Sequence, residues 1–452
     1  MGKLFGTDGI RGVANCGLDA TLAYKTGLAA AFVIAKSQHS ERRAKIIIGK
    51  DTRISSDMIE SALVAGICSA GADVELVGVI PTPAVAFLTV KHGADAGIVI
   101  SASHNPFEHN GIKIFSSNGF KLSDALENEM ENLIENPDQI PLMTHEKIGR
   151  IYHREEGALS DYVDHLSSIK NIDISGMKIA VDCANGASYR SADMMFSRFN
   201  AEYQIINAAP NGVNINSLCG STSLSGLKKH VVDGGFDIGI AFDGDADRCL
   251  AVDEKGDTID GDVIMALCAA KMQSEGRLPH ESFVATMLSN LGLHAFAREK
   301  GISITTSNVG DRYVLEKMIE GGFALGGEQS GHVIFLEYAT TGDGEITALQ
   351  FLNALKASGK SASEFSSEVV QYPQMTINVK VPADKKAEIA SRKEVKDAIE
   401  KAQRETLTEG RVLVRPSGTE ALVRVMAEGK CIDDVEAAAR DIASVIEEIS
   451  KG

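Results

Sequence analysis

The chain has 452 residues, of which 44% are hydrophobic and 24% charged, the balance of a soluble globular protein rather than a disordered one. Its formal net charge of −17 repels nucleic acid and anionic membranes, so we expect neither as a partner. The N-terminus lacks the apolar core of a signal peptide, and no run of about 18 apolar residues occurs. Seven cysteines without a C-x-x-C pair indicate reduced core thiols, and together these features predict a cytoplasmic protein.

Three segments repeat one order of elements, which predicts three similar mixed α/β domains. Each begins with a short apolar strand, at 45–49, 178–182 and 282–286. A helical stretch and a second strand follow, the second strands lying at 73–79, 202–206 and 302–306. The third strands lie at 96–100, 238–242 and 323–326. Continuous apolar runs of this kind indicate sheets covered on both faces.

The first predicted helix shows the local signals. Ser56 is placed to cap its N-terminus, and Gly71 to end it. Ile59, Leu63 and Ile67 form one apolar stripe between them.

The segment from about residue 371 differs from the three repeats. It carries strand-like runs at 375–381, 412–415 and 422–427, and then a helix in which Val435, Ala438, Ile442, Val445 and Ile449 share one face. This pattern indicates a smaller α+β domain. The predicted α/β domains are therefore 1–153, 154–254 and 255–369, and the predicted α+β domain is 370–452.

The loops after the third strands are the places to look for function, because ligands bind at the carboxyl ends of strands in open α/β sheets. The serine loop is Ser-Ala-Ser-His-Asn-Pro at 101–106, and the aspartate loop is Asp-Gly-Asp-Ala-Asp-Arg at 243–248. The glutamate loop is Gly-Glu-Gln-Ser-Gly-His at 327–332. Three equivalent positions of this kind are expected to line one central cleft.

The aspartate loop is a candidate metal site. Asp243, Asp245 and Asp247 alternate, so that one turn can aim three oxygens at a hard cation. A calcium-binding EF-hand shares this spacing and would use Glu254, but Arg248 stands where that loop needs glycine and the flanks resemble strands. A solvated acidic turn is the other alternative, and it fits poorly because three close carboxylates repel one another.

The serine loop is less specific by itself, since serine, asparagine and proline also favour an ordinary turn. A serine hydroxyl can nevertheless accept a phosphoryl group when a metal screens the charge, and the aspartate loop can supply that metal. Ser101 and Ser103 are both candidates. We favour Ser103, which lies further from the strand and next to His104.

Two other segments suit an anion. The arginine loop at 415–420, Arg-Pro-Ser-Gly-Thr-Glu, is followed by Arg424, and together they offer two guanidinium groups and two hydroxyls to a phosphate. Residues 6–12 place Arg11 within a glycine-rich turn. A β-turn and a plain loop are the respective alternatives.

Six ordered stretches together resemble the motifs of the α-D-phosphohexomutase family, nearly from end to end. They are 6–12, 101–106 with 110–113, 243–248, 309–313, 327–332 and 415–420. The resemblance implies four domains around a central active-site cleft. It also implies an isomerase that moves a phosphoryl group between two positions of a hexose phosphate, through a phosphoserine and a bisphosphorylated sugar.

The resemblance implies roles for individual residues as well. Ser103 would carry the phosphoryl group, and one Mg²⁺ would be held by the seryl phosphate with Asp243, Asp245 and Asp247. Glu328 and Ser330 match residues that bind sugar hydroxyls. The residues matching those that bind the distal phosphate are Arg415, Ser417, Gly418, Thr419 and Arg424. The residues that match those around the transferring phosphoryl group are Arg11, His104, Lys113 and Arg248. Either Lys113 or His332 would carry the proton.

Within the family, Gln329 resembles the branch that acts on glucosamine phosphates, as do 310–312 and 340–344. Pro416 and Ala421 depart from the usual pattern of the arginine loop. The branch implies interconversion of glucosamine 6-phosphate and glucosamine 1-phosphate, which supplies UDP-N-acetylglucosamine and cell-wall precursors. A mannose or glucose phosphomutase, a non-catalytic sugar-phosphate-binding protein and a metal-dependent phosphatase stay as alternatives. The oligomeric state is open, a homodimer included.

Overall fold

The computed structural model describes residues 4–6, 8–37, 42–417 and 421–451. Backbone contacts divide the chain into two compact units. The large unit comprises Met1–Leu288 and Ile302–Ser367, and the small unit comprises Ser289–Gly301 and Glu368–Gly452. Among the described residues, no helix is both long and apolar enough to span a bilayer.

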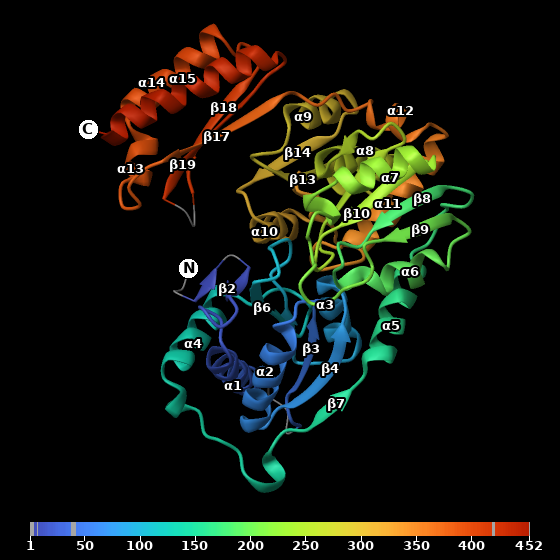
Figure 1. Ribbon diagram of the computed structural model, residues 1–452, viewed down its shortest axis with the longest axis vertical. Helices are drawn as coiled ribbons and strands as arrows, with labels where there is room; N and C mark the ends of the chain where they lie inside the picture. Colours follow the sequence, from blue (N-terminus) through green and yellow to red (C-terminus); the bar gives the residue numbers. More distant parts are fainter. Residues whose placement is uncertain (1–3, 7, 38–41, 418–420, 452) are drawn as a thin grey trace. The chain divides into compact units, whose positions relative to one another are not determined.

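The first sheet of the large unit has seven strands in the order β1-β2-β6-β5-β3-β4-β7. They are β1 (Phe5–Gly6), β2 (Gly9–Val13), β3 (Lys45–Lys50), β4 (Asp73–Val79), β5 (Ala96–Ile100), β6 (His109–Ser116) and β7 (Ile151–His153). Helices α1 (Ala20–Ser37), α2 (Ser56–Ser69) and α4 (Asp124–Glu135) pack together, while α3 (Thr82–Lys91) contacts β3 and β5 (Figure 1). Ile46 and Ile48 join the core of α1 and α2, whereas Ile47 is buried on the other face.

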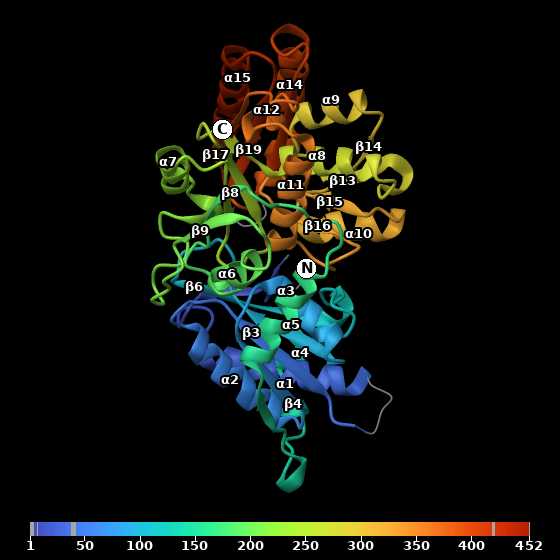
Figure 2. The same cartoon turned by 90° about the vertical axis from the view of Figure 1, so that its right-hand side faces the viewer.

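The second sheet has five strands in the order β12-β11-β10-β8-β9. They are β8 (Lys178–Asp182), β9 (Glu202–Ile206), β10 (Ile238–Phe242), β11 (Cys249–Asp253) and β12 (Thr258–Ile259). Helices α6 (Ser191–Phe196) and α7 (Ser225–Gly234) accompany this sheet, and α7 packs on β8 and β10. Helix α5 (Glu155–Ser167) contacts α6 and also β4 and α3, and Figure 2 shows α5 beside α3.

The third sheet has four strands in the order β14-β13-β15-β16. They are β13 (Ser282–Thr286), β14 (Ser303–Ser307), β15 (Leu325–Gly327) and β16 (Val333–Phe335). Helix α8 (Gly261–Ser274) packs against α11 (Gly344–Ser358), and α10 (Asp311–Gly321) contacts β13 and β15. The short helix α12 (Ala362–Ser366) closes the large unit.

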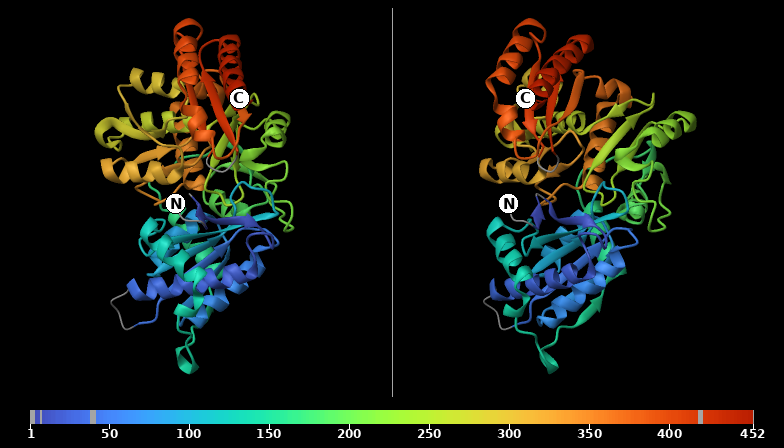
Figure 3. Two further views of the ribbon diagram at one scale, coloured as in Figure 1. Left: turned by 90° about the vertical axis from the view of Figure 1, so that its left-hand side faces the viewer. Right: turned by 60° about the vertical axis from the view of Figure 1, so that its left-hand side comes forward.

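The small unit is built on a three-stranded antiparallel sheet in the order β17-β19-β18. Its strands are β17 (Gln374–Lys380), β18 (Arg411–Pro416) and β19 (Leu422–Glu428), and its helices are α9 (Leu291–Glu299), α13 (Lys386–Ser391), α14 (Lys393–Glu405) and α15 (Ile432–Lys451). Figure 3 shows α14 and α15 beside the sheet. Val435, Ala438 and Ile442 of the predicted helix face are fully buried in its core.

The predicted fold class is confirmed, since three mixed sheets with their helices precede a smaller antiparallel sheet with its helices. Strands β14 and β17 lie one residue from their predicted places. The start of β15 is displaced further, to Leu325, because Gly322 ends α10 at φ +67 and the Phe323 amide donates to the Met318 carbonyl at 2.9 Å. The boundaries of the four domains remain predictions.

Two smaller expectations are wrong. Ser56 does not cap α2, because Ser55 precedes the helix and the Ser56 hydroxyl donates to Asp51 instead. All seven cysteines are free, but Cys16 and Cys431 are exposed rather than in a core.

Candidate active site

The serine loop follows β5 directly and places two hydroxyls in different surroundings. Ser103 is buried, and its Oγ donates to Asp243 Oδ2 of the aspartate loop at 2.6 Å. Ser101 Oγ instead donates to Asp51 Oδ2 at 2.6 Å and accepts from the Ser103 amide at 2.9 Å. Of the two candidate nucleophiles, Ser103 is therefore the one that faces the aspartates.

The aspartate loop joins β10 to β11, so strands flank it and not the helices of an EF-hand. One oxygen from each of Asp243, Asp245 and Asp247 lies within 4.8 Å of the others, and all three residues are buried. Asp245 Oδ1 and Asp247 Oδ1 are buried without a hydrogen-bond partner among the described residues. Buried carboxylate oxygens of this kind need a compensating charge, so the donor set fits a metal ion.

Asp243 and Asp247 differ in proton affinity. Burial raises the pKa of Asp243 well above its usual range, and the charges of Asp247 and Asp245 add to the effect. Burial also opposes ionisation of Asp247, but Lys113 and His332 outweigh it and hold that pKa well below its usual range. A divalent cation among them would favour the ionised form of all three.

Lys113 lies on β6 and completes this cluster of charges. Its Nζ is 2.9 Å from Asp245 Oδ2, 3.1 Å from Asp8 Oδ2 and 3.5 Å from Asp247 Oδ2. Burial lowers its pKa, but these carboxylates outweigh burial and raise the pKa well above its usual value. Lys113 is therefore a buried ammonium group beside the candidate metal site.

Three further predicted residues surround Ser103 and the aspartates. His104 Nδ1 lies 3.3 Å from Ser103 Oγ, and burial together with the charges of Arg248 and Arg11 lowers the pKa of His104 to about 4. Arg11 pairs with Asp8. The Arg248 amide donates to Asp243 Oδ1 at 3.2 Å, and its Nε lies 3.8 Å from Asp247 Oδ1.

The glutamate loop lies between β15 and β16. Glu328 Oε1 accepts from the Gly310 amide at 2.9 Å, while Ser330 Oγ is buried with no partner among the described residues. His332 Nδ1 lies 3.6 Å from Asp247 Oδ2; burial lowers its pKa, but Asp247 and Asp311 outweigh burial and raise it. Gln329 Nε2 donates to Oδ2 of Asp260, the N-cap of α8, at 3.1 Å.

The arginine loop belongs to the small unit. Strands β18 and β19 place Arg415 directly opposite Arg424, and residues paired in this way project from the same face of a hairpin. Burial and the charge of Arg424 lower the pKa of Arg415. Ser417 is buried at the end of the strand, whereas Gly418 and Thr419 lie outside the described residues. Two like charges held together indicate an anion site.

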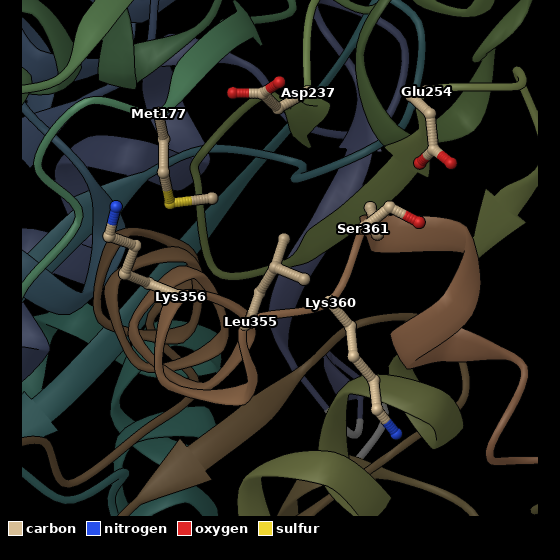
Figure 4. A pocket seen from close by; sticks show the side chains of 9 residues that line it. Met177, Asp237, Glu254, Leu355, Lys356, Lys360 and Ser361 are labelled. Carbon is tan, nitrogen blue, oxygen red and sulfur yellow. The ribbon is translucent and has the colours of Figure 1, made fainter.

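A separate pocket of about 280 Å³ lies near the end of α11 (Figure 4). Met177 and Leu355 give it an apolar wall, and Lys356 and Lys360 lie at its rim. Asp237 and Glu254 are its acidic residues. Glu254, which an EF-hand would have used, accepts hydrogen bonds from the amide and hydroxyl of Ser363. The pocket contains none of the predicted site residues.

Comparison with known proteins identifies the family. Four sequence profiles of phosphoglucomutase/phosphomannomutase match the chain: α/β/α domain I over 2–141, domain II over 160–256, domain III over 260–372 and the C-terminal domain over 377–445. The chain belongs to the phosphoglucomutase/phosphomannomutase family. This family membership confirms the resemblance that the six motifs indicated.

Relatives at higher identity define the branch of the family. The chain is 52% identical to the phosphoglucosamine mutase of Acetivibrio thermocellus over 449 residues, and 51% identical to that of Clostridium novyi over 449 residues, with 99% of each chain covered in both cases. A solved family protein from Burkholderia thailandensis has a TM-score of 0.83 at 23% identity, covering 99% of this chain and 98% of the other. At that identity the likeness shows the fold alone.

Sequence analysis missed three residues that contact these loops: Arg53, which is buried, and Lys121 and Asn216, which are partly buried. Lys121 Nζ lies 2.6 Å from Asp8 Oδ1 and also pairs with Asp311, which lies within the motif at 309–313. Arg53 and Asn216 both donate to the serine loop. Arg53 follows β3, so the rule about strand ends would have found it. Lys121 and Asn216 lie in irregular loops without such a signal.

Proposed function

We propose that the chain interconverts glucosamine 6-phosphate and glucosamine 1-phosphate through phosphorylated Ser103. The identity of about 50% over the full chain to proteins named phosphoglucosamine mutase supports this substrate. The observation that carries the chemistry is the buried Ser103 Oγ, 2.6 Å from a carboxylate of the three-aspartate group.

In the proposed reaction, the phosphoryl group passes from Ser103 Oγ to O1 of glucosamine 6-phosphate. The bond from phosphorus to Oγ breaks as the bond to O1 forms, and the O1 proton is lost while Oγ regains one. The resulting 1,6-bisphosphate turns over in the site, and its C6 phosphoryl group then returns to Ser103. The transition state is loose, so positioning and charge neutralisation supply most of the catalysis.

Mg²⁺ held by Asp243, Asp245, Asp247 and the seryl phosphate would supply part of this neutralisation. The solved N-acetylphosphoglucosamine mutase of Aspergillus fumigatus, 17% identical with a TM-score of 0.71 over 99% of this chain and 96% of its own, contains GlcNAc-6P and magnesium. A variant of that enzyme was solved with glucose 1,6-bisphosphate.

The cationic residues of the site divide into two roles. Arg11, Arg248 and Lys113 stabilise the oxygens of the transferring group. Lys113 and His332 are the proposed proton carriers. The raised pKa of His332 favours its protonated form, which can return a proton to the leaving oxygen. The pKa of Lys113 is raised well above its usual value, which keeps this residue an ammonium group. His104, with its pKa lowered to about 4, stays neutral near pH 7 and is suited to accept a hydrogen bond beside Oγ.

The sugar and the distal phosphate are assigned to the other two loops. Glu328 and Ser330 bind sugar hydroxyls, and the unpartnered Ser330 Oγ supports its role. Arg415, Ser417, Gly418, Thr419 and Arg424 bind the phosphate that is not reacting. Because these residues recognise only a phosphate dianion, they can hold either end of the hexose. We place the reaction in the cytoplasm, where its product supplies UDP-N-acetylglucosamine.

The test compares kcat/KM on the 6-phosphates of glucosamine, mannose and glucose. We expect a strong preference for glucosamine 6-phosphate, and phosphate on Ser103 by peptide mapping. Ser103→Ala should abolish turnover without unfolding the chain, while Ser61→Ala on the exposed face of α2 serves as the control. A preference for mannose would overturn the substrate. Release of inorganic phosphate in step with substrate loss would indicate a phosphatase, and phosphate on another serine would refute Ser103.

A further inference from the structure

Arg53 is a fully buried arginine whose five N–H groups all have partners. Its Nε donates to Asp51 Oδ2 at 2.7 Å. The other four N–H groups donate to backbone carbonyls of the serine loop and its continuation: Ser103 at 2.9 Å, Asn105 at 2.8 Å, Pro106, and His109 at 3.0 Å. A guanidinium group has five donors in a fixed plane, and here every one is used.

The same ion pair also holds the amide side of the loop. Asp51 is buried and accepts from Ser101 Oγ at 2.6 Å, and Ser101 Oγ accepts from the Ser103 amide at 2.9 Å. Asp51 and Arg53 therefore fix the carbonyl of Ser103 directly and its amide through Ser101.

A third restraint comes from the loop that follows β9 in the second sheet. Asn216 Nδ2 donates to the Ser103 carbonyl at 2.9 Å and to the Asn105 carbonyl at 3.1 Å. The aspartate loop packs against the same place, since a Cβ added to Gly244 would lie 2.5 Å from the Ser103 carbonyl oxygen and 2.7 Å from Asn216 Nδ2. The serine loop therefore has no room to move toward the aspartate loop at Gly244.

These restraints matter because Ser103 has a backbone φ of +52, in the left-handed region that side chains other than glycine rarely adopt. Such a conformation persists only where the surroundings impose it. In it, Ser103 Oγ reaches Asp243. An ordinary backbone conformation at Ser103 would redirect the hydroxyl.

We propose that Asp51, Arg53, Ser101 and Asn216, the serine-loop network, are positioning residues that set the rate of phosphoryl transfer by holding Ser103 toward the aspartate loop. The proposal rests on the proposed function. None of the four is assigned a contact with the sugar phosphate, so the network acts through Ser103 alone.

The test uses the full chain with three variants. Arg53→Lys keeps the charge but offers three donors where Asp51 and the loop together accept five. Asn216→Ala removes the restraint from the second sheet. Arg277→Lys is the matched control, because Arg277 pairs with Glu275 and Glu337 away from the site.

We expect Arg53→Lys to lower kcat by about tenfold to a hundredfold, because a displacement of about 1 Å has this effect on an aligned reaction. Asn216→Ala should lower kcat by a smaller factor. In both variants KM for glucosamine 6-phosphate should stay near the wild-type value, and transfer from glucose 1,6-bisphosphate to Ser103 should slow by the same factor as kcat. Arg277→Lys should match the wild type.

A folded Arg53→Lys variant with wild-type kcat overturns the proposal, as does a rise in KM alone or an equal loss in Arg277→Lys. If Arg53→Lys does not fold, Asn216→Ala decides: unchanged kcat and unchanged phosphoryl transfer overturn the proposal. A wild-type chain without mutase activity refutes the proposed function instead, so the two failures are distinguishable.

Discussion

Two regions of the molecule arrange charge in opposite ways. One is the transfer centre, which consists of Ser103, Lys113 and the three aspartates; the other is the arginine hairpin of β18 and β19. In the transfer centre, an ammonium lies within 3.5 Å of two buried aspartates, and burial is nearly complete. In the hairpin, Arg415 faces Arg424, and like charges opposite each other on a sheet repel. The transfer centre balances much of its own charge, whereas the proposed function assigns the hairpin to an anion of the ligand.

This difference suits two tasks. Phosphoryl transfer requires donors and charges fixed before the substrate arrives, because reorganisation during the reaction is costly. Holding a phosphate while the hexose changes orientation requires only charge and hydrogen-bond donors. The comparison predicts that mutations in the transfer centre lower kcat, while those in the hairpin raise KM.

The largest effect should come from Asp245→Asn. Asp245 Oδ2 accepts from Thr82 Oγ1 at 2.7 Å and lies 2.9 Å from Lys113 Nζ, while its Oδ1 is among the unpartnered oxygens of the metal group. Asparagine keeps the size but removes the charge, so we expect kcat to fall by at least about a hundredfold and the Mg²⁺ concentration for half-maximal activity to rise. Activity titrated with Mg²⁺ measures both.

The control for this experiment is Asp233→Asn, whose carboxylate is exposed on α7 and pairs with Lys229. Chelation should abolish the activity of the wild type and of this control alike, and added Mg²⁺ should restore both. An Asp245→Asn variant with wild-type activity and wild-type Mg²⁺ dependence would show that Asp245 does not bind a catalytic metal. The proposed difference between the transfer centre and the hairpin would then be wrong.

A smaller effect, on KM rather than on kcat, is expected from Arg415→Gln. Hydrogen bonds to a charged group contribute about 1.5–3 kcal/mol, so KM for glucosamine 6-phosphate should rise by about tenfold to a hundredfold. Thermal stability should not fall, because the substitution also removes repulsion between Arg415 and Arg424. Steady-state kinetics and thermal unfolding measure the two quantities.

Arg411 on the same strand provides the matched variant. Its Nε is 2.7 Å from Glu428 Oε2, and Glu428 is fully buried. Breaking a buried pair costs about 3–5 kcal/mol, so Arg411→Gln should lower the thermal midpoint and leave KM near the wild-type value. If the two variants change KM equally, the arginine hairpin has no special role in binding.

Sequence reasoning succeeded where one periodic signal determined an element. Strands such as 178–182 and 238–242 coincide with β8 and β10, because their apolar runs are buried on both faces. It was less reliable at element ends: β15 begins two residues later than predicted, because the left-handed Gly322 ends α10 and the Phe323 amide then bonds back to the helix.

The candidate site was likewise predictable only in part. The loops after the third strands were predictable from topology, and in the large unit they bring Ser103, Asp243 and His332 together. Arg53 was missed although it follows β3. Asn216 and Lys121 could not be predicted, because their roles depend on contacts between residues far apart in the sequence. Asn216 is 113 positions from Ser103, and Lys121 is 190 from Asp311. No local pattern encodes such a pairing.

The smallest predicted effect concerns stability beside the transfer centre. Asp343 accepts from the Ile346 amide at 2.9 Å as the N-cap of α11, and Tyr162 donates to it at 2.8 Å. Burial raises the pKa of Asp343 to about 6. Helix α11 begins against the aspartate loop, since the Gly344 amide donates to the Ala246 carbonyl at 2.9 Å. The large unit therefore contains a carboxyl group that is costly to ionise, next to charges that are balanced.

Asp343→Asn measures that cost. Because the folded chain binds the Asp343 proton more tightly than the unfolded chain, its contribution is complete below pH of about 4 and is lost as pH rises through about 6. Asparagine cannot ionise; its carbonyl oxygen keeps the contact with the Ile346 amide, and its NH2 group can donate to the Tyr162 hydroxyl oxygen in place of Oδ2. Relative to its difference from the wild type near pH 4, the variant should therefore gain up to about 3 kcal/mol of stability above pH 7. Thermal midpoints across this range measure the gap. A gap in stability that is the same at every pH would mean that Asp343 ionises in the folded chain without cost. Burial would then not favour the protonated form of this carboxyl group.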